Sequence, residues 1–177
     1  MADCFPGEIT IGGKIPAALL QEFLGELNST GAKVGAYDGP AFACKTAADL
    51  RQVLDENGRL FLASDRAPNG QFAEMEDFCV RHGIPFDRHS DARHGFKAEN
   101  VMYRPGMKRP AEVPSDDSGD VLLRAETVRP LAKEVARLVT ARLTREKLLA
   151  AATRVIRRLY SLLPPEIEPL PPLEIVE

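Results

Sequence analysis

Histidines and carboxylates gather in one short stretch of this chain, and they are the side chains best suited to chemistry. All three histidines fall between residues 82 and 94. Asp87, His89 and Asp91 alternate, so an extended backbone would direct these three side chains to one face. Imidazole and carboxylate groups together can bind zinc, manganese or iron. The spacing therefore offers a candidate site for a metal-dependent hydrolase at Asp87, His89, Asp91 and His94. A polar edge strand with one face in water is the alternative.

Arginine side chains are interleaved with the same histidines and aspartates. General acid–base catalysis requires two titratable groups that are brought together with separated pKa values, and the sequence does not show such a pair. A charged, hydrogen-bonding segment of this kind favours contact with a partner instead. We therefore predict a binding surface, with no catalytic residue, made of Arg88, His89, Asp91, Arg93 and His94.

A second basic cluster lies in the C-terminal third of the chain. It comprises Arg145, Lys147, Arg154, Arg157 and Arg158. Such a cluster could bind nucleic acid through the phosphates. A single aromatic residue accompanies it and no named nucleic-acid motif is present, so base stacking has little support. The alternative is an amphipathic helix whose arginines face water.

Neither the glycines nor the cysteines form a specific motif. Gly12-Gly13-Lys14 stands between a predicted strand and a predicted helix, but it matches neither of the glycine-rich phosphate-binding patterns. We expect a tight turn there. Cys4, Cys44 and Cys79 are scattered and form no CxxC pair, so we expect reduced thiols in a reducing compartment and no cofactor.

The elements that position these side chains follow from apolar periodicity and from turn residues. Alternation of polar and apolar residues indicates strands, apolar residues at steps of three and four indicate helices, and glycine, proline and asparagine mark the turns. We predict strands over 8–11, 33–37, 60–63, 85–90 and 100–104, helices over 16–31, 46–57 and 72–83, and a loop over 65–70.

The chain also contains an internal repeat. A glycine, a strand, a helix and a second glycine recur, and the two glycines are 24 positions apart in the first unit (Gly7 to Gly31) and 25 in the second (Gly58 to Gly83). Two such units predict an α+β fold, a split-βαβ (ferredoxin-like) sandwich with an inserted helix over 46–57, followed by a C-terminal helical arm. An open parallel α/β sheet is the alternative.

Charge and proline content divide the chain into four segments. Residues 119–165 carry 10 Lys+Arg against 4 Asp+Glu, whereas residues 1–118 carry 13 against 18. Apolar residues in the basic segment recur at helical spacing and are interrupted at Arg142, which predicts two helices or one kinked helix. We expect an α/β sandwich domain at 1–104, a linker at 105–119, a basic amphipathic helical arm at 120–163 and a proline-rich acidic tail at 164–177.

Three segments together resemble a family of small uncharacterised bacterial and mobile-element proteins. They are residues 7–16 (GEITIGGKIP), 82–91 (HGIPFDRHSD) and 171–176 (PPLEIV). The family has no established activity, so the resemblance implies no catalytic role for any residue. Modulation of a host complex would suit a protein of a mobile element.

These observations favour a non-enzymatic binding or regulatory module that acts in the cytoplasm through protein–protein contacts. No targeting signal opens the sequence, and no apolar stretch approaches the ~18 residues that a membrane helix requires, so no membrane association is expected. We expect the helical arm to bind a protein partner or to self-associate. Nucleic-acid binding through the arm and metal-dependent hydrolysis through the His/Asp segment are the two alternatives.

Overall fold

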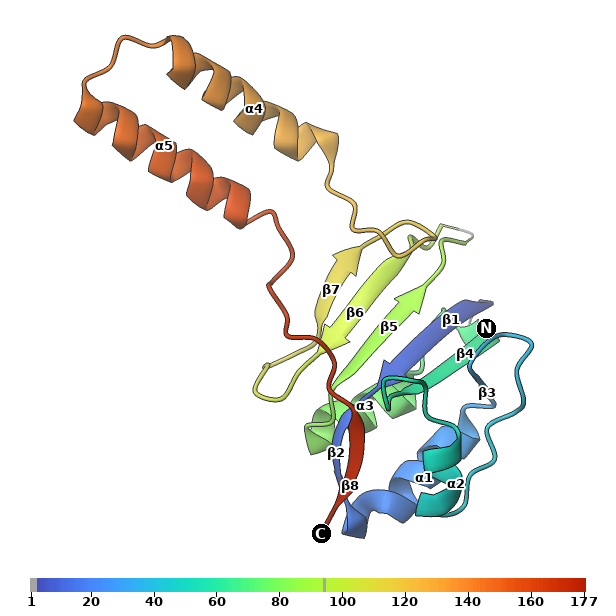
Figure 1. Cartoon of the computed structure of the whole chain (residues 1–177). Coiled ribbons are helices and arrows are strands. Elements are labelled where there is room, and N and C mark those ends of the chain that lie inside the picture. The colour runs from blue at the N-terminus through green and yellow to red at the C-terminus, as the bar shows by residue number, and fades with distance from the viewer. Residues whose placement is uncertain (1–2, 94) are drawn as a thin grey trace. The chain divides into compact units, whose positions relative to one another are not determined.

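The computed structural model describes residues 3–93 and 95–177 of the chain, which divides into two compact units (Figure 1). The first unit comprises Met1–Val121 together with Ile167–Glu177, and the second comprises Leu122–Glu166. We call the first unit the body and the second unit the hairpin. The hairpin is therefore inserted into the sequence of the body, and each unit is described by itself below.

A six-stranded sheet forms the centre of the body, in the order β3-β4-β1-β5-β6-β7. Every neighbouring pair in it is antiparallel, which differs from the open parallel sheet considered as the alternative. The two strands that flank β1 both pair with it along most of its length. The strands are β1 (Cys4–Ile11), β3 (Lys33–Val34), β4 (Leu60–Pro68), β5 (Phe86–Ser90), β6 (Glu99–Tyr103) and β7 (Ala111–Pro114).

The helices of the body begin and end at local sequence signals. They are α1 (Leu20–Ser29), which follows a short 3-10 helix (Ala17–Leu19), α2 (Ala47–Gln52) and α3 (Ala73–His82). A capping box opens α2, because the Thr46 hydroxyl accepts from the Asp49 N–H and the Asp49 carboxylate accepts from the Thr46 N–H. Gly83 closes α3 with a left-handed φ of 67°. The sequence predicts both signals, although α2 ends earlier than the predicted residue 57.

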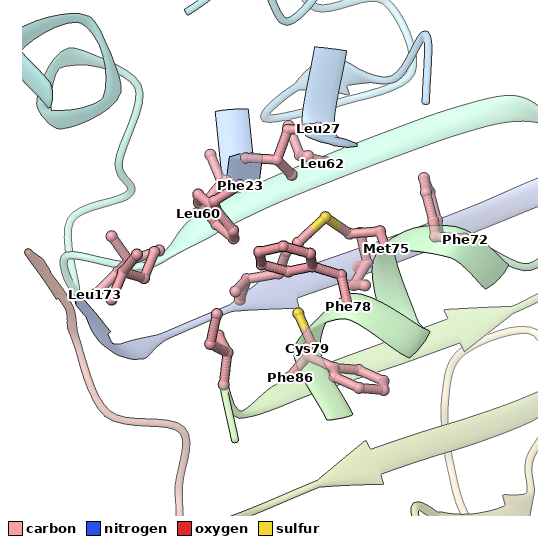
Figure 2. Close-up of a cluster of buried hydrophobic side chains, with 14 of the residues drawn as sticks. Phe23, Leu27, Leu60, Leu62, Phe72, Met75, Phe78, Cys79, Phe86 and Leu173 are labelled. Atoms are coloured by element: carbon pink, nitrogen blue, oxygen red, sulfur yellow. The ribbon is translucent and has the colours of Figure 1, made fainter. Parts of the chain in front are cut away.

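The hydrophobic core lies between the helices and one face of the sheet (Figure 2). The apolar residues predicted along α1 supply it from one side, and α3 supplies Met75, Phe78 and Cys79. The rings of Phe23 and Phe78 bring the two helices together, with centroids 6.1 Å apart. The sheet contributes fully buried side chains that alternate along its central strands: Ile9, Ile11, Leu60, Leu62 and Phe86.

The tail returns to the body and adds a strand. β8 (Leu173–Val176) pairs in parallel with β2 (Gly13–Pro16), so that Lys14 lies opposite Glu174. The Leu173 N–H also donates to the Gly58 carbonyl at 2.8 Å. The proline content predicts extended polyproline-II-like chain here, but the last residues of the tail form a strand because β2 offers them backbone partners.

Two more segments differ from the predicted elements. β4 continues through the predicted loop at 65–70 and pairs with β1 as far as Pro68, with a register shift between Phe5 and Gly7. Residues 105–119, predicted as a linker, contain β7, which pairs with β6. Proline is tolerated at Pro114 because β7 is an edge strand with one side unpaired.

The hairpin consists of α4 (Ala125–Thr140) and α5 (Arg145–Tyr160), joined by residues 141–144. The sequence predicts two helices or one kinked helix with an interruption at Arg142, and the structure has two helices with the break there. The helices pack against each other, and each buries one large side chain, Leu131 on α4 and Val155 on α5. None of the helices in the described part of the chain has the length and apolar composition needed to cross a membrane.

Candidate functional site

Strand β5 directs the predicted binding residues to opposite faces of the sheet. Arg88 lies on the helix-covered face and is only 3% exposed. Its guanidinium forms ion pairs with Glu76 of α3 (Nε to Oε1, 3.0 Å) and with Glu99 of β6 (Nη2 to Oε1, 2.6 Å). It also donates to the Ser90 hydroxyl at 3.0 Å. Arg88 is therefore a buried structural cation, and it does not share a surface with His89.

Within this cluster of ion pairs, the carboxyl group of Glu76 has a shifted pKa. Burial raises the pKa of the Glu76 carboxyl above its ordinary value, and the charge of Arg88 offsets only part of that effect. The cluster is therefore a polar centre inside the body that holds α3, β5 and β6 together. Sequence reasoning missed both of its carboxylates, because they are distant from Arg88 in the chain.

His89 lies on the opposite face, in a chain of hydrogen bonds. Its Nδ1 is 2.8 Å from Asn100 Oδ1, and Asn100 Nδ2 donates to the Gly119 carbonyl at 2.8 Å. Because the bond to Gly119 fixes the amide orientation and an amide oxygen only accepts, Nδ1 of His89 carries a proton. The Nε2 atom then faces Asp91 Oδ1 at 3.4 Å. Sequence reasoning missed Asn100, which lies directly across the β5–β6 pairing from His89.

The proposed metal ligands do not all converge. The Asp87 carboxylate accepts two hydrogen bonds from Arg104, one at each oxygen, at 2.7 and 3.0 Å. His89 and Asp91 approach each other, whereas His94 lies outside the described residues. Within residues 3–93 and 95–177, no group of three or more His, Cys, Asp or Glu side chains is arranged to hold a metal ion.

Two further polar residues adjoin His89 and Asp91. Glu8 of β1 is the cross-strand partner of His89. Burial raises the pKa of the Tyr37 hydroxyl, and the neighbouring carboxylates Glu8 and Asp91 raise it further. Arg93 is exposed, and its backbone forms a bridge with Phe96. The outward-facing part of the predicted surface is thus a small acidic and imidazole cluster without Arg88.

The hairpin exposes large apolar side chains on both helices. Val139 is 81% exposed, Leu149 59% and Ile156 52%. We define the apolar stripe as the six most regularly spaced of the exposed side chains within these helices: Val135, Val139, Leu148, Leu149, Ile156 and Leu159. One helical hairpin has too few neighbours to cover this stripe, so these side chains stay in contact with water.

The stripe follows a seven-residue repeat. With Val128 and Ala152 at position a of a heptad a–g, the two buried residues, Leu131 and Val155, both lie at d. The stripe residues lie at a, d and e. Leu149 and Ile156 are separated by one full repeat at e. The apolar residues predicted from steps of three and four lie at positions a and d. The exposed apolar residues at e are additional, and those steps do not include them.

The predicted nucleic-acid residues lie on α5, outside the stripe. Arg154, Arg157 and Arg158 line a groove of about 350 Å³ together with Thr153 and Ser161. Arg158 Nη1 also donates to Glu134 Oε2 of α4 at 2.8 Å. The remaining predicted residues, Arg145 and Lys147, are exposed in the first turn of α5.

A cleft of about 520 Å³ lies between the tail and the rest of the body. Five of its eleven lining residues are prolines, and Lys14, Arg104, Glu168 and Glu174 supply charges of both signs. Arg104 is held there by donating to the Glu168 carbonyl at 2.8 Å as well as to Asp87.

Comparisons with protein-family models, with curated proteins and with solved structures give no match for this chain.

Proposed function

We propose that this protein is a non-enzymatic binding module that acts through protein–protein contacts made by the hairpin. The observation that carries the proposal is the apolar stripe, which runs along both helices and is not covered within the hairpin. Soluble proteins rarely expose a contiguous apolar patch larger than a few hundred Å², and larger ones usually mark interaction sites.

The energetics favour a covered stripe. Complete burial of a Val, Leu or Ile side chain is worth roughly 1.5–3 kcal/mol. Six such side chains, each left about half exposed, therefore retain on the order of 5 kcal/mol of transfer free energy that a partner could recover. Two antiparallel helices alone are marginally stable, so docking on a partner would also stabilise the hairpin itself.

Charged residues and the apolar stripe occupy different sides of each helix. Leu122–Glu166 carries 10 Lys+Arg against 4 Asp+Glu, but apart from Arg145 the charged residues of α4 and α5 occupy positions b, c, f and g. The stripe itself contains no charge. An apolar contact surface bordered by basic residues suits a protein interface, whose centre is depleted in charge and whose rim is polar.

We also propose that the body has the ferredoxin-like arrangement and that the protein acts in the cytoplasm. The strand order β3-β4-β1-β5 supports the first, since β1 separates β4 from β5 and β4 separates β1 from β3, as two interlocked βαβ units require. The three cysteines, which are all free thiols, support the second.

Site-specific photo-crosslinking in cells that produce the protein tests the binding proposal. A benzophenone side chain at Ile156 or Val139, within the stripe, is expected to give protein adducts. The same group at Arg154 or Arg137, at the outward position c, is expected to give far fewer. Adducts with any protein, including another copy, support the proposal. Absence of protein adducts from both stripe positions, with the chain intact, contradicts it.

A second candidate function is nucleic-acid binding through the arginine-lined groove of α5. Three arginines that converge on one groove would contact phosphates and release counterions. Fluorescence polarisation with a short labelled duplex and a short single strand, at low and moderate salt, tests this. Arg154→Ala with Arg157→Ala should weaken binding and flatten its salt dependence, whereas Ile156→Ala, which leaves the charge unchanged, should not. No binding at low salt excludes the groove as a nucleic-acid site.

A further inference from the structure

We infer that the occupant of the apolar stripe is a second copy of this chain, which joins two α4–α5 hairpins into a four-helix bundle. The inference rests on the proposed function and names its partner. It is argued from the heptad positions of the exposed residues, from the ion pair between the helices and from the equal lengths of α4 and α5.

The heptad positions indicate how many neighbours each helix requires. Apolar residues at a and d form the seam between two helices, whereas a face that adds e is typical of helices in the core of a bundle. Both helices add e, with Val139 on α4 and Leu149 and Ile156 on α5. In one hairpin each helix has a single helical neighbour, so the e positions lack a partner. A second hairpin would give every helix a second neighbour.

The ion pair shows which side of the hairpin is open. Glu134 and Arg158 both lie at g and pair across the helices at 2.8 Å. In an antiparallel helix pair the g positions border the seam on one side and the e positions border it on the other. The g side is therefore polar and internally paired, and the e side is apolar and exposed. The second copy would dock on the e side.

The lengths and composition favour a second copy over a single foreign helix. α4 and α5 have 16 residues each, and both present apolar e positions, so the hairpin offers two rows on helices of equal length. A two-fold symmetric interface pairs a surface with itself, and such a bundle satisfies both rows at once. The basic residues at c and f would face outward, and their like charges would stay in water.

The mass of the purified full-length chain in solution, measured by light scattering and sedimentation across a dilution series, tests this inference. We expect twice the 19.4 kDa of one chain. Val139→Glu and Ile156→Glu would each place a charge in the bundle core and should weaken dimerisation by ~100-fold or more. Ala136→Glu and Ala150→Glu add the same charge at the outward positions b and f and should change it less than about threefold.

A second measurement covers the case in which a glutamate unfolds the hairpin. A benzophenone group at Ile156 of the purified chain should give a covalent homodimer, and the same group at Ala150 should not. A monomer without self-crosslinking overturns the second-copy inference. If adducts with other proteins still form at Ile156 in cells, the proposed binding function stands alone; if none form, both fail. A dimer that all four glutamate variants leave intact also overturns the inference, because it would use another surface.

Discussion

The backbone at Gly12 lies so close to Pro171 that a Cβ atom on Gly12 would stand 2.0 Å from the Pro171 carbonyl oxygen. This approach brings the start of β2 against the tail, where the Gly13 N–H donates to the Pro172 carbonyl at 3.0 Å. Two of the segments that carry the family resemblance are thus in direct contact, although more than 150 residues separate them in the sequence.

Substitution of Gly12 should therefore release the tail. Gly12→Ala cannot be accommodated without moving the backbone, so we expect a loss of about 3 kcal/mol in the free energy of unfolding. Gly25→Ala is the matched control, because a Cβ there meets nothing within 4 Å and alanine favours helix by up to ~1 kcal/mol. Urea unfolding measures both, and equal effects at the two glycines would refute the close approach.

Arg88 should contribute to stability rather than to binding. Arg88→Met leaves Glu76 and Glu99 without their buried cation and should cost about 3–5 kcal/mol. Arg93→Met removes an exposed arginine and should change stability by less than about 0.5 kcal/mol. The double variant Arg88→Met with Glu76→Gln should lose less than the sum of the two single variants. Additive losses would argue against coupling between these side chains.

The raised pKa of Glu76 predicts a pH dependence of stability with a definite sign. The folded state holds the Glu76 proton more tightly than the unfolded state does, so this group favours folding most below its ordinary value of 4.5. Its contribution falls as pH rises from there through the raised folded-state pKa. The wild-type chain should therefore lose stability relative to Glu76→Gln between acidic and neutral pH. An unchanged difference in urea midpoint across that range contradicts the prediction.

Tyr37 should ionise at higher pH than an ordinary tyrosine. Burial and the carboxylates of Glu8 and Asp91 raise the pKa of its hydroxyl above the ordinary value of 10.0. The ultraviolet difference titration between the wild-type chain and Tyr37→Phe isolates this group. Glu8→Gln should lower the Tyr37 pKa, because it removes the neighbouring negative charge. A Tyr37 transition at the ordinary value in the folded protein would contradict the arrangement of these side chains.

The three thiols should differ sharply in reactivity. Cys4 is exposed, whereas Cys44 and Cys79 are buried, and burial raises the pKa of both buried thiols. A chromogenic disulfide reagent should modify one thiol per chain rapidly under native conditions and three in denaturant. Cys4→Ser should abolish the rapid phase. Rapid reaction of all three in the native protein would contradict the burial of α3 against the sheet.

Local signals explain the parts of the fold that sequence reasoning predicts. The apolar face of α1, the capping box at Thr46 and the terminating Gly83 each depend on residues within one or two helical turns. β7 and β8 were not predictable in the same way, because their backbone partners come from distant segments and their prolines resemble linker sequence. Hydrogen-bond pairing overrides that local composition.

The candidate site likewise contains some features that the sequence predicts and others that it does not. Alternation along β5 correctly groups His89 with Asp91 on one face, and the same rule places Arg88 on the other face, although the predicted binding surface combined all three. The partners of Arg88 could not be identified without the tertiary packing of α3 and β6. The e positions of the hairpin, by contrast, are visible in the sequence as the seven-residue separation of Leu149 and Ile156.

The pairing of β8 with β2 also sets an order for biosynthesis. Because β8 follows the hairpin in the sequence, a ribosome must translate α4 and α5 before the strand that completes the body emerges. Until then the nascent body lacks the Leu173 side chain in its core and the hydrogen bond from the Leu173 N–H to the Gly58 carbonyl. A message that ended prematurely within the hairpin would therefore yield a body without the β2–β8 pair and without the Leu173 side chain in its core.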